Sequence, residues 1–196
     1  MEQVSKLKPI VFAHSGGAQG SAGQGSYNLV SHLRSELSNV FEIYYPIIED
    51  PEAPTYEAWK RMFDEEFEKI TEPVILIGHS LGGSMLLKYL SEERTRFSIA
   101  GLFLVAIPHW GEEGWEVDDF VLREDFEESM PNVPSIYFYH SIGDEIVPFK
   151  HLKFYRKAFP NARVRELAGK EHAFTDGLPE LVRDIRPIDG ILRIYS

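Results

Sequence analysis

The chain of 196 residues contains no cysteine. This absence excludes a disulfide framework, a thiolate metal site and a cysteine nucleophile. No apolar run approaches the roughly 18 residues that a membrane-spanning helix requires, and the first residues lack the apolar stretch of a signal peptide. We therefore expect a cytoplasmic protein without a membrane span.

Positive charge is also scarce. The 20 Lys and Arg residues stand against 31 Asp and Glu residues, which leaves a formal net charge of −11 at pH 7. Nucleic acids and anionic membranes attract basic surfaces, so this balance argues against both as partners. A protein partner is not indicated either. The hydrophobic fraction of 43% and the charged fraction of 26% are ordinary for a globular protein, and the length suits one domain over residues 1–196.

One stretch, residues 73–90, combines three signals in the order PVILIGHSLGGSMLLKYL. Residues 74–77 form a short apolar run rich in β-branched side chains, which is typical of a strand buried on both faces of a parallel sheet. A glycine-flanked serine, Ser80, comes next, and residues 84–90 favour a helix. Strand, G-x-S-x-G turn and helix are the context of a nucleophile elbow.

The spacing of this stretch suits a nucleophilic serine. A tight turn raises the hydroxyl group of Ser80 above the sheet, toward a base and an electrophile. Such a turn strains the serine backbone and brings neighbouring chain close, so Gly78 and Gly82 must lack side chains. The helix begins directly behind Ser80 and points its first N–H groups at a developing oxyanion. Ser80 is therefore the predicted nucleophile.

Apolar runs and helical stripes alternate along the rest of the chain. Strands are predicted at 9–13, 40–48, 74–77, 99–107, 135–140 and 162–167, and helices at 27–37, 55–70, 84–90, 149–159 and 178–184. Ser26 and Thr55 are the expected N-caps of the first two helices. This alternation indicates an α/β fold, with helices on both faces of a parallel sheet. Segment 108–134 shows no clear period, and no element is assigned to 189–196.

A glycine-dense loop, residues 14–25, follows the first strand. It contains no lysine and matches neither the P-loop nor the G-x-G-x-x-G pattern, so we predict no bound cofactor. The consecutive acids of 64–68 favour a solvated helix face over a metal site. We expect the backbone N–H groups of the glycine-dense loop to face the active site and supply an oxyanion donor. A plain surface loop is the alternative.

Two further polar groups lie beyond the carboxyl ends of predicted strands, where the catalytic groups of open α/β sheets are found. They are Asp144 and His172, and with Ser80 they give the chain order Ser, Asp, His of a known catalytic triad. His172 would take the proton of Ser80, and Asp144 would orient the imidazole. His14 is a rival base. His79 is expected to direct its side chain away from Ser80 into a structural contact, and Glu145 to point elsewhere.

Three motifs together resemble the α/β-hydrolase superfamily: GHSLGG at 78–83, GDEIVP at 143–148 and GKEHAF at 169–174. The small size and the stretch DPEAPTYEAW at 50–59 are similar to the small serine hydrolases of the retinoblastoma-binding protein 9 type. The resemblance implies a six-stranded, mainly parallel sheet in the order 2-1-3-4-5-6 without a large cap domain. It also implies that Ser80, Asp144 and His172 form the triad, and that the backbone N–H of Leu81 is one oxyanion donor.

The second oxyanion donor is open at this point. The resemblance implies Ser15 or Gly16, but the chain carries His14-Ser15-Gly16-Gly17 where such hydrolases usually have a His-Gly pair. His14, which lies beside these residues, is also a candidate for lining the substrate pocket.

Segment 108–134 holds large aromatic side chains among many acids. Trp110 and Trp115 are candidates for the wall of an apolar acyl pocket, because ligand sites are mostly lined by such groups. The alternative is that these side chains pin the segment to the core. The surrounding acids would disfavour anionic substrates.

The sequence thus predicts a cofactor-free, metal-free serine hydrolase that cleaves a carboxylic ester of a small molecule through an acyl-enzyme on Ser80. A thioesterase, a peptidase or an acyltransferase could use the same triad. A catalytically weak protein that mainly binds other proteins is the alternative from a different class, since a fold does not determine a function.

Overall fold

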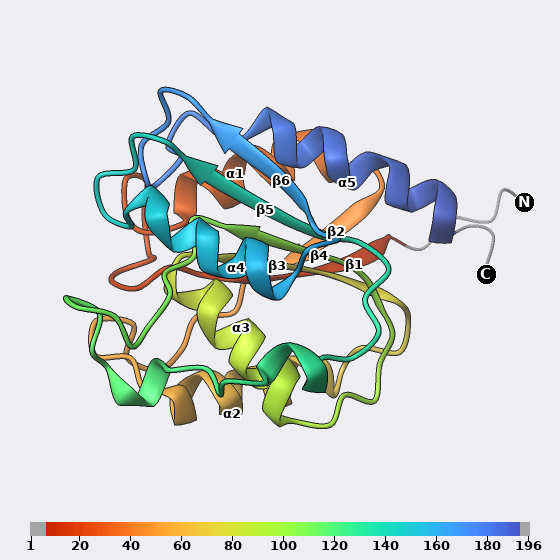
Figure 1. The fold of residues 1–196 in the computed structure, drawn as a ribbon. Helices are drawn as coiled ribbons and strands as arrows, with labels where there is room; N and C mark the ends of the chain where they lie inside the picture. Colours follow the sequence, from red (N-terminus) through yellow and green to blue (C-terminus); the bar gives the residue numbers. More distant parts are fainter. Residues whose placement is uncertain (1–6, 193–196) are drawn as a thin grey trace, which may run out of the picture.

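A six-stranded sheet runs through the molecule (Figure 1). The computed structural model describes residues 7–192, with side chains up to residue 188. The strands are β1 (Lys8–Ala13), β2 (Phe41–Tyr44), β3 (Val74–His79), β4 (Ile99–Val105), β5 (Ile136–Ser141) and β6 (Arg163–Leu167). Their order is β2-β1-β3-β4-β5-β6, and all five neighbouring pairs are parallel. The predicted order is confirmed.

Helices cover both faces of the sheet, as the alternation of the sequence predicted. The helices are α1 (Tyr27–Leu37), α2 (Tyr56–Phe67), α3 (Leu81–Glu92), α4 (Leu152–Ala158) and α5 (Pro179–Leu192). A short 3-10 helix, η3 (Phe149–His151), leads into α4. None of the helices in the described part of the chain is long and apolar enough to cross a membrane.

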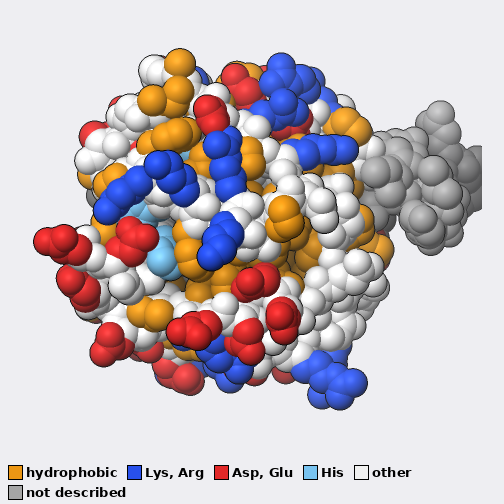
Figure 2. Space-filling view, in the orientation of Figure 1, with side chains coloured by type: hydrophobic (Ala, Val, Ile, Leu, Met, Phe, Trp, Pro, Cys, Tyr) orange, Lys and Arg blue, Asp and Glu red, His pale blue; other side chains and the backbone are white. Residues whose placement is uncertain are grey.

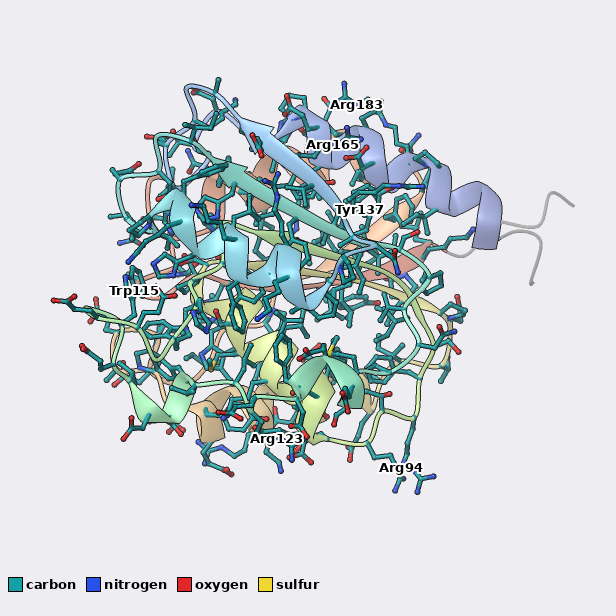
Figure 3. All side chains as sticks on the ribbon, viewed as in Figure 1. Arg94, Trp115, Arg123, Tyr137, Arg165 and Arg183 are labelled. Atoms are coloured by element: carbon teal, nitrogen blue, oxygen red, sulfur yellow. The ribbon has the colours of Figure 1, made fainter. Side chains whose placement is uncertain are left out.

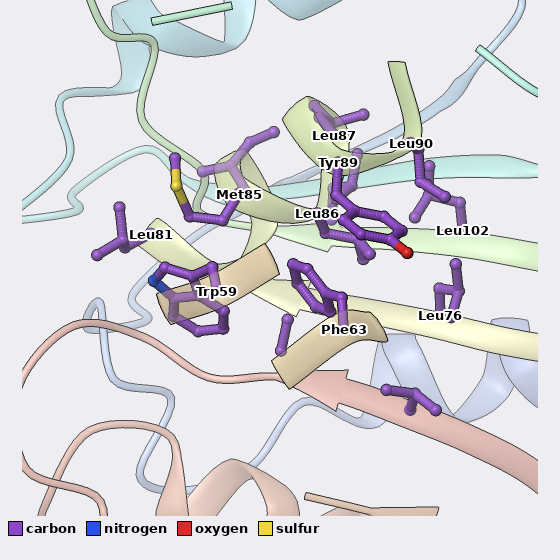
Figure 4. Close-up of a cluster of buried hydrophobic side chains, with 14 of the residues drawn as sticks. Trp59, Phe63, Leu76, Leu81, Met85, Leu86, Leu87, Tyr89, Leu90 and Leu102 are labelled. Carbon is purple, nitrogen blue, oxygen red and sulfur yellow. The ribbon is translucent and has the colours of Figure 1, made fainter. Parts of the chain in front are cut away.

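Two apolar cores lie on opposite faces of the sheet because successive side chains of a strand alternate in direction. Ile10 and Phe12 of β1 pack with α1 and α5, whereas Val11 and Ala13 pack with α2, α3 and α4. The second core includes a row of aromatic rings on α2, in which Trp59 and Phe63 lie 5.7 Å apart (Figure 4). The central strands are buried on both sides, and this explains their continuous apolar sequences.

The structure corrects the predicted length of the second strand. Residues 40–48 were predicted to form one strand, but β2 pairs with β1 only over Phe41–Tyr44. Pro46 has no N–H group to donate to a ladder, and the N–H of Ile48 donates to the imidazole of His14 instead. The chain therefore leaves the sheet early and turns toward the end of β1.

The segment between β4 and β5 contains only two short 3-10 helices, η1 (Asp118–Phe120) and η2 (Phe126–Ser129), in agreement with its lack of periodicity. At the other end of the sequence, α5 extends past the predicted 178–184 to Leu192. It takes in the first half of the stretch 189–196, and residues 193–196 lie outside the described part.

Candidate active site

Ser80 is the single residue between the end of β3 and the start of α3. Its backbone has φ 54° and ψ −127°, a conformation that residues with side chains rarely adopt. The Ser80 N–H donates to the carbonyl of Val105 on β4 at 2.8 Å, which ties the turn to the neighbouring strand. The predicted strand–turn–helix elbow is therefore present, with the strain located at the serine.

The glycines around Ser80 allow the chain to approach itself closely. A Cβ atom on Gly78 would lie 2.4 Å from the Cα of Gly83, and one on Gly82 would lie 2.2 Å from the carbonyl oxygen of His14. Both contacts are with backbone atoms, which cannot rotate away. The requirement for glycine at these two positions, inferred from the motif, is thus a steric one.

Ser80, His172 and Asp144 form a connected row of hydrogen bonds. The Nδ1–H of His172 donates to Asp144 Oδ2 at 2.9 Å, and the Oγ–H of Ser80 donates to His172 Nε2 at 2.9 Å. A carboxylate can only accept, so Asp144 determines that the imidazole proton sits on Nδ1 and that Nε2 faces the serine as a base. The three residues come from loops that follow β3, β5 and β6 at the same edge of the sheet.

Asp144 is held as a carboxylate although its side chain has no exposed surface. Its Oδ1 accepts the backbone N–H groups of Ile146 and Val147 at 2.9 and 2.8 Å. Burial by itself raises the pKa of Asp144, but the hydrogen bond and charge of His172 and these two N–H groups outweigh it, so the pKa lies below its ordinary value. Asp144 thus remains able to stabilise a protonated His172.

From the sequence, Glu145 was expected to point away from the site, but it contacts the backbone of His172. Both of its carboxylate oxygens accept the backbone N–H of His172, at 3.2 and 3.1 Å. Adjacent acids therefore act on the same histidine in two ways, with Asp144 on the ring and Glu145 on the main chain. The sequence does not reveal this contact, because the two residues it joins are 27 positions apart.

The hydrogen bonds of the glycine-dense loop distinguish between the two candidates for the second oxyanion donor. The N–H of Ser15 donates to the Oγ of Ser26 at 2.9 Å, and the N–H of Gly17 donates to the carbonyl of Pro51 at 2.7 Å. Within residues 7–192, no such acceptor is found for the N–H of Gly16. A Cβ on Gly16 would lie 3.7 Å from a methyl group of Leu81, so Gly16 borders the elbow.

His14 and His79 are both completely buried and take structural positions. Nδ1–H of His14 donates to the carbonyl of Ser15, and its Nε2 accepts the N–H of Ile48. His14 therefore has no exposed surface with which to line a pocket, which corrects that expectation, and no free nitrogen with which to act as the base. His79 contacts Ser26 and the main chain of His172, as its expected structural role requires.

Trp110 and Trp115 belong to an aromatic cluster on the segment after β4. Their ring centroids are 5.1 Å apart, and the ring of Trp110 lies 4.9 Å from that of Phe120. Trp110 packs on the core, whereas Trp115, near the strand ends in Figure 3, contacts His151. The core thus anchors the inner end of this cluster, and Trp115 lies at its half-buried outer end.

Acidic side chains surround this cluster. In Figure 2, Asp and Glu side chains gather at the lower left, over the segment between β4 and β5, where Glu113, Glu116 and Asp118 are exposed. A cavity of about 480 Å³ lies elsewhere, lined by residues such as Tyr89, Arg94 and Phe97, and includes no triad residue. Among residues 7–192, no group of three or more His, Cys, Asp or Glu side chains is arranged to hold a metal ion.

A sheet with this strand order, followed at its carboxyl edge by a serine on an elbow, an aspartate and a histidine, defines the α/β-hydrolase class. The model of the serine hydrolase family matches residues 19–176. The chain belongs to that family. No curated protein matches its sequence.

Solved structures share the fold at low sequence identity. The ydeN gene product of Bacillus subtilis superposes with a TM-score of 0.77 at 20% identity, covering 93% of this chain and 98% of that one. A YdeN-like hydrolase of Pectobacterium atrosepticum gives 0.71 at 18% identity, over 96% and 94%. Est1E of Butyrivibrio proteoclasticus, solved with ferulic acid bound, gives 0.66 at 15% identity, over 97% and 91%. The likeness to the retinoblastoma-binding protein 9 type stays a prediction.

The first prediction concerns the steric requirement at the elbow. Gly82→Ala places a methyl group against the backbone of β1, and we expect it to lower the free energy of unfolding by more than about 3 kcal/mol. Gly143→Ala is the matched control, since a Cβ there meets open space and should cost less than about 1 kcal/mol. Urea unfolding measures both. Equal losses in the two variants would contradict the steric explanation.

The second prediction concerns acid stability. Burial lowers the pKa of His14 to about 4 and that of His79 to about 3. The unfolded chain protonates both imidazoles below a pKa of about 6.5, whereas the folded chain does not. Acidification therefore favours the unfolded state, by about 2 kcal/mol for each histidine near pH 5. Unfolding free energies measured between about pH 7.5 and pH 5 check this, and a constant value would contradict it.

Proposed function

We propose that the protein is a hydrolase of carboxylic esters that uses Ser80 as nucleophile, His172 as base and Asp144 as the group that orients the base. The observation that carries this proposal is the row of two 2.9 Å hydrogen bonds from Asp144 through His172 to Ser80. These two hydrogen bonds support the proposal because they place the imidazole proton on Nδ1. Nε2 of His172 is then unprotonated and faces the serine hydroxyl.

The reaction follows from these positions. Oγ of Ser80 attacks the acyl carbon while Nε2 of His172 takes the hydroxyl proton. The ester C–O bond breaks, and His172 returns the proton to the leaving alcohol. A water molecule then attacks the acyl carbon while His172 takes one of its protons. The bond between the acyl carbon and Oγ breaks, His172 returns the proton to Oγ of Ser80, and the carboxylic acid is released. Asp144 stabilises the imidazolium in each half.

The backbone N–H groups of Leu81 and Gly16 are the proposed oxyanion donors. Leu81 is the first residue of α3, so its N–H has no acceptor within the helix, and the helix dipole favours negative charge there. Gly16 is preferred to Ser15 because the N–H of Ser15 already donates to Ser26. Donors placed in advance at a developing charge are among the largest contributions to such catalysis.

An ester of a small molecule is the proposed substrate class. Est1E and the other esterase and hydrolase structures that share the fold make this chemistry the natural first test, although their sequence identities of 20% or less support only the fold. A thioesterase, a peptidase or an acyltransferase would use the same residues. A protein-binding role without catalysis would need neither the strained Ser80 nor the connected triad.

The third prediction tests the triad. Ser80→Ala should abolish labelling by a fluorophosphonate while leaving the melting temperature nearly unchanged, because only the hydroxyl is lost. His172→Ala and Asp144→Asn should each lower kcat by several orders of magnitude. Labelling rates and ester kinetics measure these effects.

Glu145→Gln is the matched control for Asp144→Asn. It also neutralises a carboxylate, but the amide oxygen that remains can still accept the N–H of His172, so the loss in kcat should be mild. Undiminished labelling of Ser80→Ala would exclude the proposed nucleophile and favour the binding role. A larger loss in Glu145→Gln than in Asp144→Asn would refute the assignment of the acid.

Trp110 and Trp115 are proposed to form a partial wall of the acyl pocket. The support is their shared aromatic cluster, anchored at Trp110 and open to solvent at Trp115. The acids around them would repel a carboxylate on the substrate. We therefore expect neutral esters of short or medium acyl chains to be better substrates than long-chain or anionic ones.

The fourth prediction tests this wall with p-nitrophenyl esters of graded chain length. Trp110→Ala or Trp115→Ala should raise kcat/KM for the longer chains relative to the shorter ones by about tenfold, the lower end of the effect expected for one methylene group in an apolar pocket. Tyr44→Ala, which removes a partly exposed ring from β2, should leave the preference unchanged. An unaltered preference in both tryptophan variants would mean that these rings only pin the segment to the core.

A further inference from the structure

A buried chain of hydrogen bonds behind Ser80 joins the loop of the base to the loop of the second oxyanion donor. His79, next to the nucleophile, contacts the carbonyl of His172 with its Nε2 at 2.9 Å. Its Nδ1 lies 2.8 Å from the Oγ of Ser26. That hydroxyl oxygen accepts the N–H of Ser15 at 2.9 Å. From the sequence, Ser26 was expected only as a helix cap, and this chain of hydrogen bonds was not anticipated.

A single proton on the imidazole of His79 determines which group donates in each hydrogen bond of this chain. A carbonyl oxygen only accepts, so Nε2 of His79 must carry hydrogen to contact the carbonyl of His172. Because burial lowers the pKa of His79 to about 3, the ring holds only that one proton. Nδ1 therefore accepts from the hydroxyl of Ser26. The Oγ of Ser26 therefore uses a lone pair to accept the N–H of Ser15.

Ser26 gives up its ordinary role to make these contacts. It occupies the N-cap position of α1, where a serine hydroxyl usually accepts an N–H of the first helical turn. Here it makes no such bond. The side chain is completely buried and turned toward His79 and Ser15. Without this capping hydrogen bond α1 is less stable. The contacts of Ser26 with His79 and Ser15 therefore have a role other than stabilising α1.

Gln19 holds the rest of the same loop in place. Its amide Nε2 donates to the carbonyls of Ser15 at 2.9 Å and Gly17 at 2.8 Å, on either side of Gly16. Its Oε1 accepts the N–H of Ser26 at 2.9 Å and the hydroxyl of Tyr45 at 2.6 Å. Although rich in glycine, the loop is thus fastened at the residues that flank Gly16.

We propose that His79 and Ser26 are positioning residues that hold the base and the second oxyanion donor at a set distance from each other across Ser80. The proposal rests on the function proposed above. His79 fixes the carbonyl of His172 on one side, and Ser26 fixes the N–H of Ser15 on the other. The peptide bond that follows Ser15 carries the N–H of Gly16, so its direction depends on this anchor.

The expected consequence is kinetic. A donor displaced by about 1 Å from a developing charge loses much of its effect, at a cost on the order of 100-fold in rate. Binding of the ground-state ester depends little on this donor. Loss of the chain of bonds should therefore lower kcat and leave KM nearly unchanged.

The fifth prediction is made for Ser26→Ala, assayed with p-nitrophenyl butyrate. We expect kcat to fall by about 10- to 100-fold with KM within about threefold of wild type. Affinity for a trifluoromethyl ketone, whose adduct with Ser80 carries an oxyanion, should fall by the same factor as kcat. A change that only loosened the fold would not make these two quantities fall together.

Ser91→Ala is the matched control. Ser91 is also a buried serine, at the far end of α3, and its hydroxyl donates to the carbonyl of Lys88. This variant loses a hydroxyl of similar burial but should keep kcat and inhibitor affinity within about twofold of wild type. Equal losses of kcat in Ser26→Ala and Ser91→Ala would overturn the proposal, as would a loss of kcat in Ser26→Ala without a loss of inhibitor affinity.

His79→Asn carries the test if Ser26→Ala does not fold. The asparagine oxygen can replace Nδ1 as the acceptor for Ser26, but the shorter side chain cannot reach the carbonyl of His172. We expect about a tenfold loss of kcat with KM retained, and unchanged kcat would overturn the proposal. The proposed hydrolase function is tested separately by fluorophosphonate labelling. If that function is wrong, the wild-type protein and the Ser80→Ala variant will be labelled to the same extent.

Discussion

The close approach of β3, Ser80 and α3 is the constraint on which the site depends. The serine can adopt φ 54° only because Gly78 and Gly83 pack backbone to backbone and Gly82 packs against the main chain of β1. The cost of this conformation, on the order of 1–3 kcal/mol, is offset by the buried strands on both sides of β3. The turn presents Oγ of Ser80 to His172 and the N–H of Leu81 to the same space, so the proposed nucleophile and one proposed oxyanion donor arise from one backbone feature.

Much of the architecture was predictable because it depends on local pattern. Continuous apolar runs indicated strands buried on both faces, and five of the six lie within about three residues of the predicted bounds. β2 was the exception, since Pro46 and the contact of Ile48 with His14 ended its pairing early. The chain order of Ser80, Asp144 and His172 was also visible in the sequence, because each follows a strand and strand ends meet at one edge of a parallel sheet.

The remaining features of the site could not be predicted, because they join residues far apart in the sequence through side chains of ordinary type. A buried serine before a helix is predicted as an N-cap, and nothing local to Ser26 shows that its hydroxyl turns to His79, 53 residues away. Glu145 was set aside beside Asp144 for the same reason. His14 was considered for the pocket because it lies beside the predicted oxyanion donors, but it has no exposed surface and both of its ring nitrogens make hydrogen bonds.

The buried histidines show how the polar groups behind the site remain compatible with a folded core. Unpaired polar atoms inside a protein are costly, whereas a neutral imidazole with one donor and one acceptor can satisfy both neighbours at once. His14 joins β1 to the chain after β2, and His79 joins the elbow to the loop of His172. Each would lose its acceptor nitrogen on protonation. The imidazole of His172 is placed differently from these two, because its Nδ1–H faces the carboxylate of Asp144 and its Nε2 faces the hydroxyl of Ser80. In the proposed mechanism proton transfer therefore falls to His172, whereas both ring nitrogens of His14 and of His79 are engaged in structural hydrogen bonds.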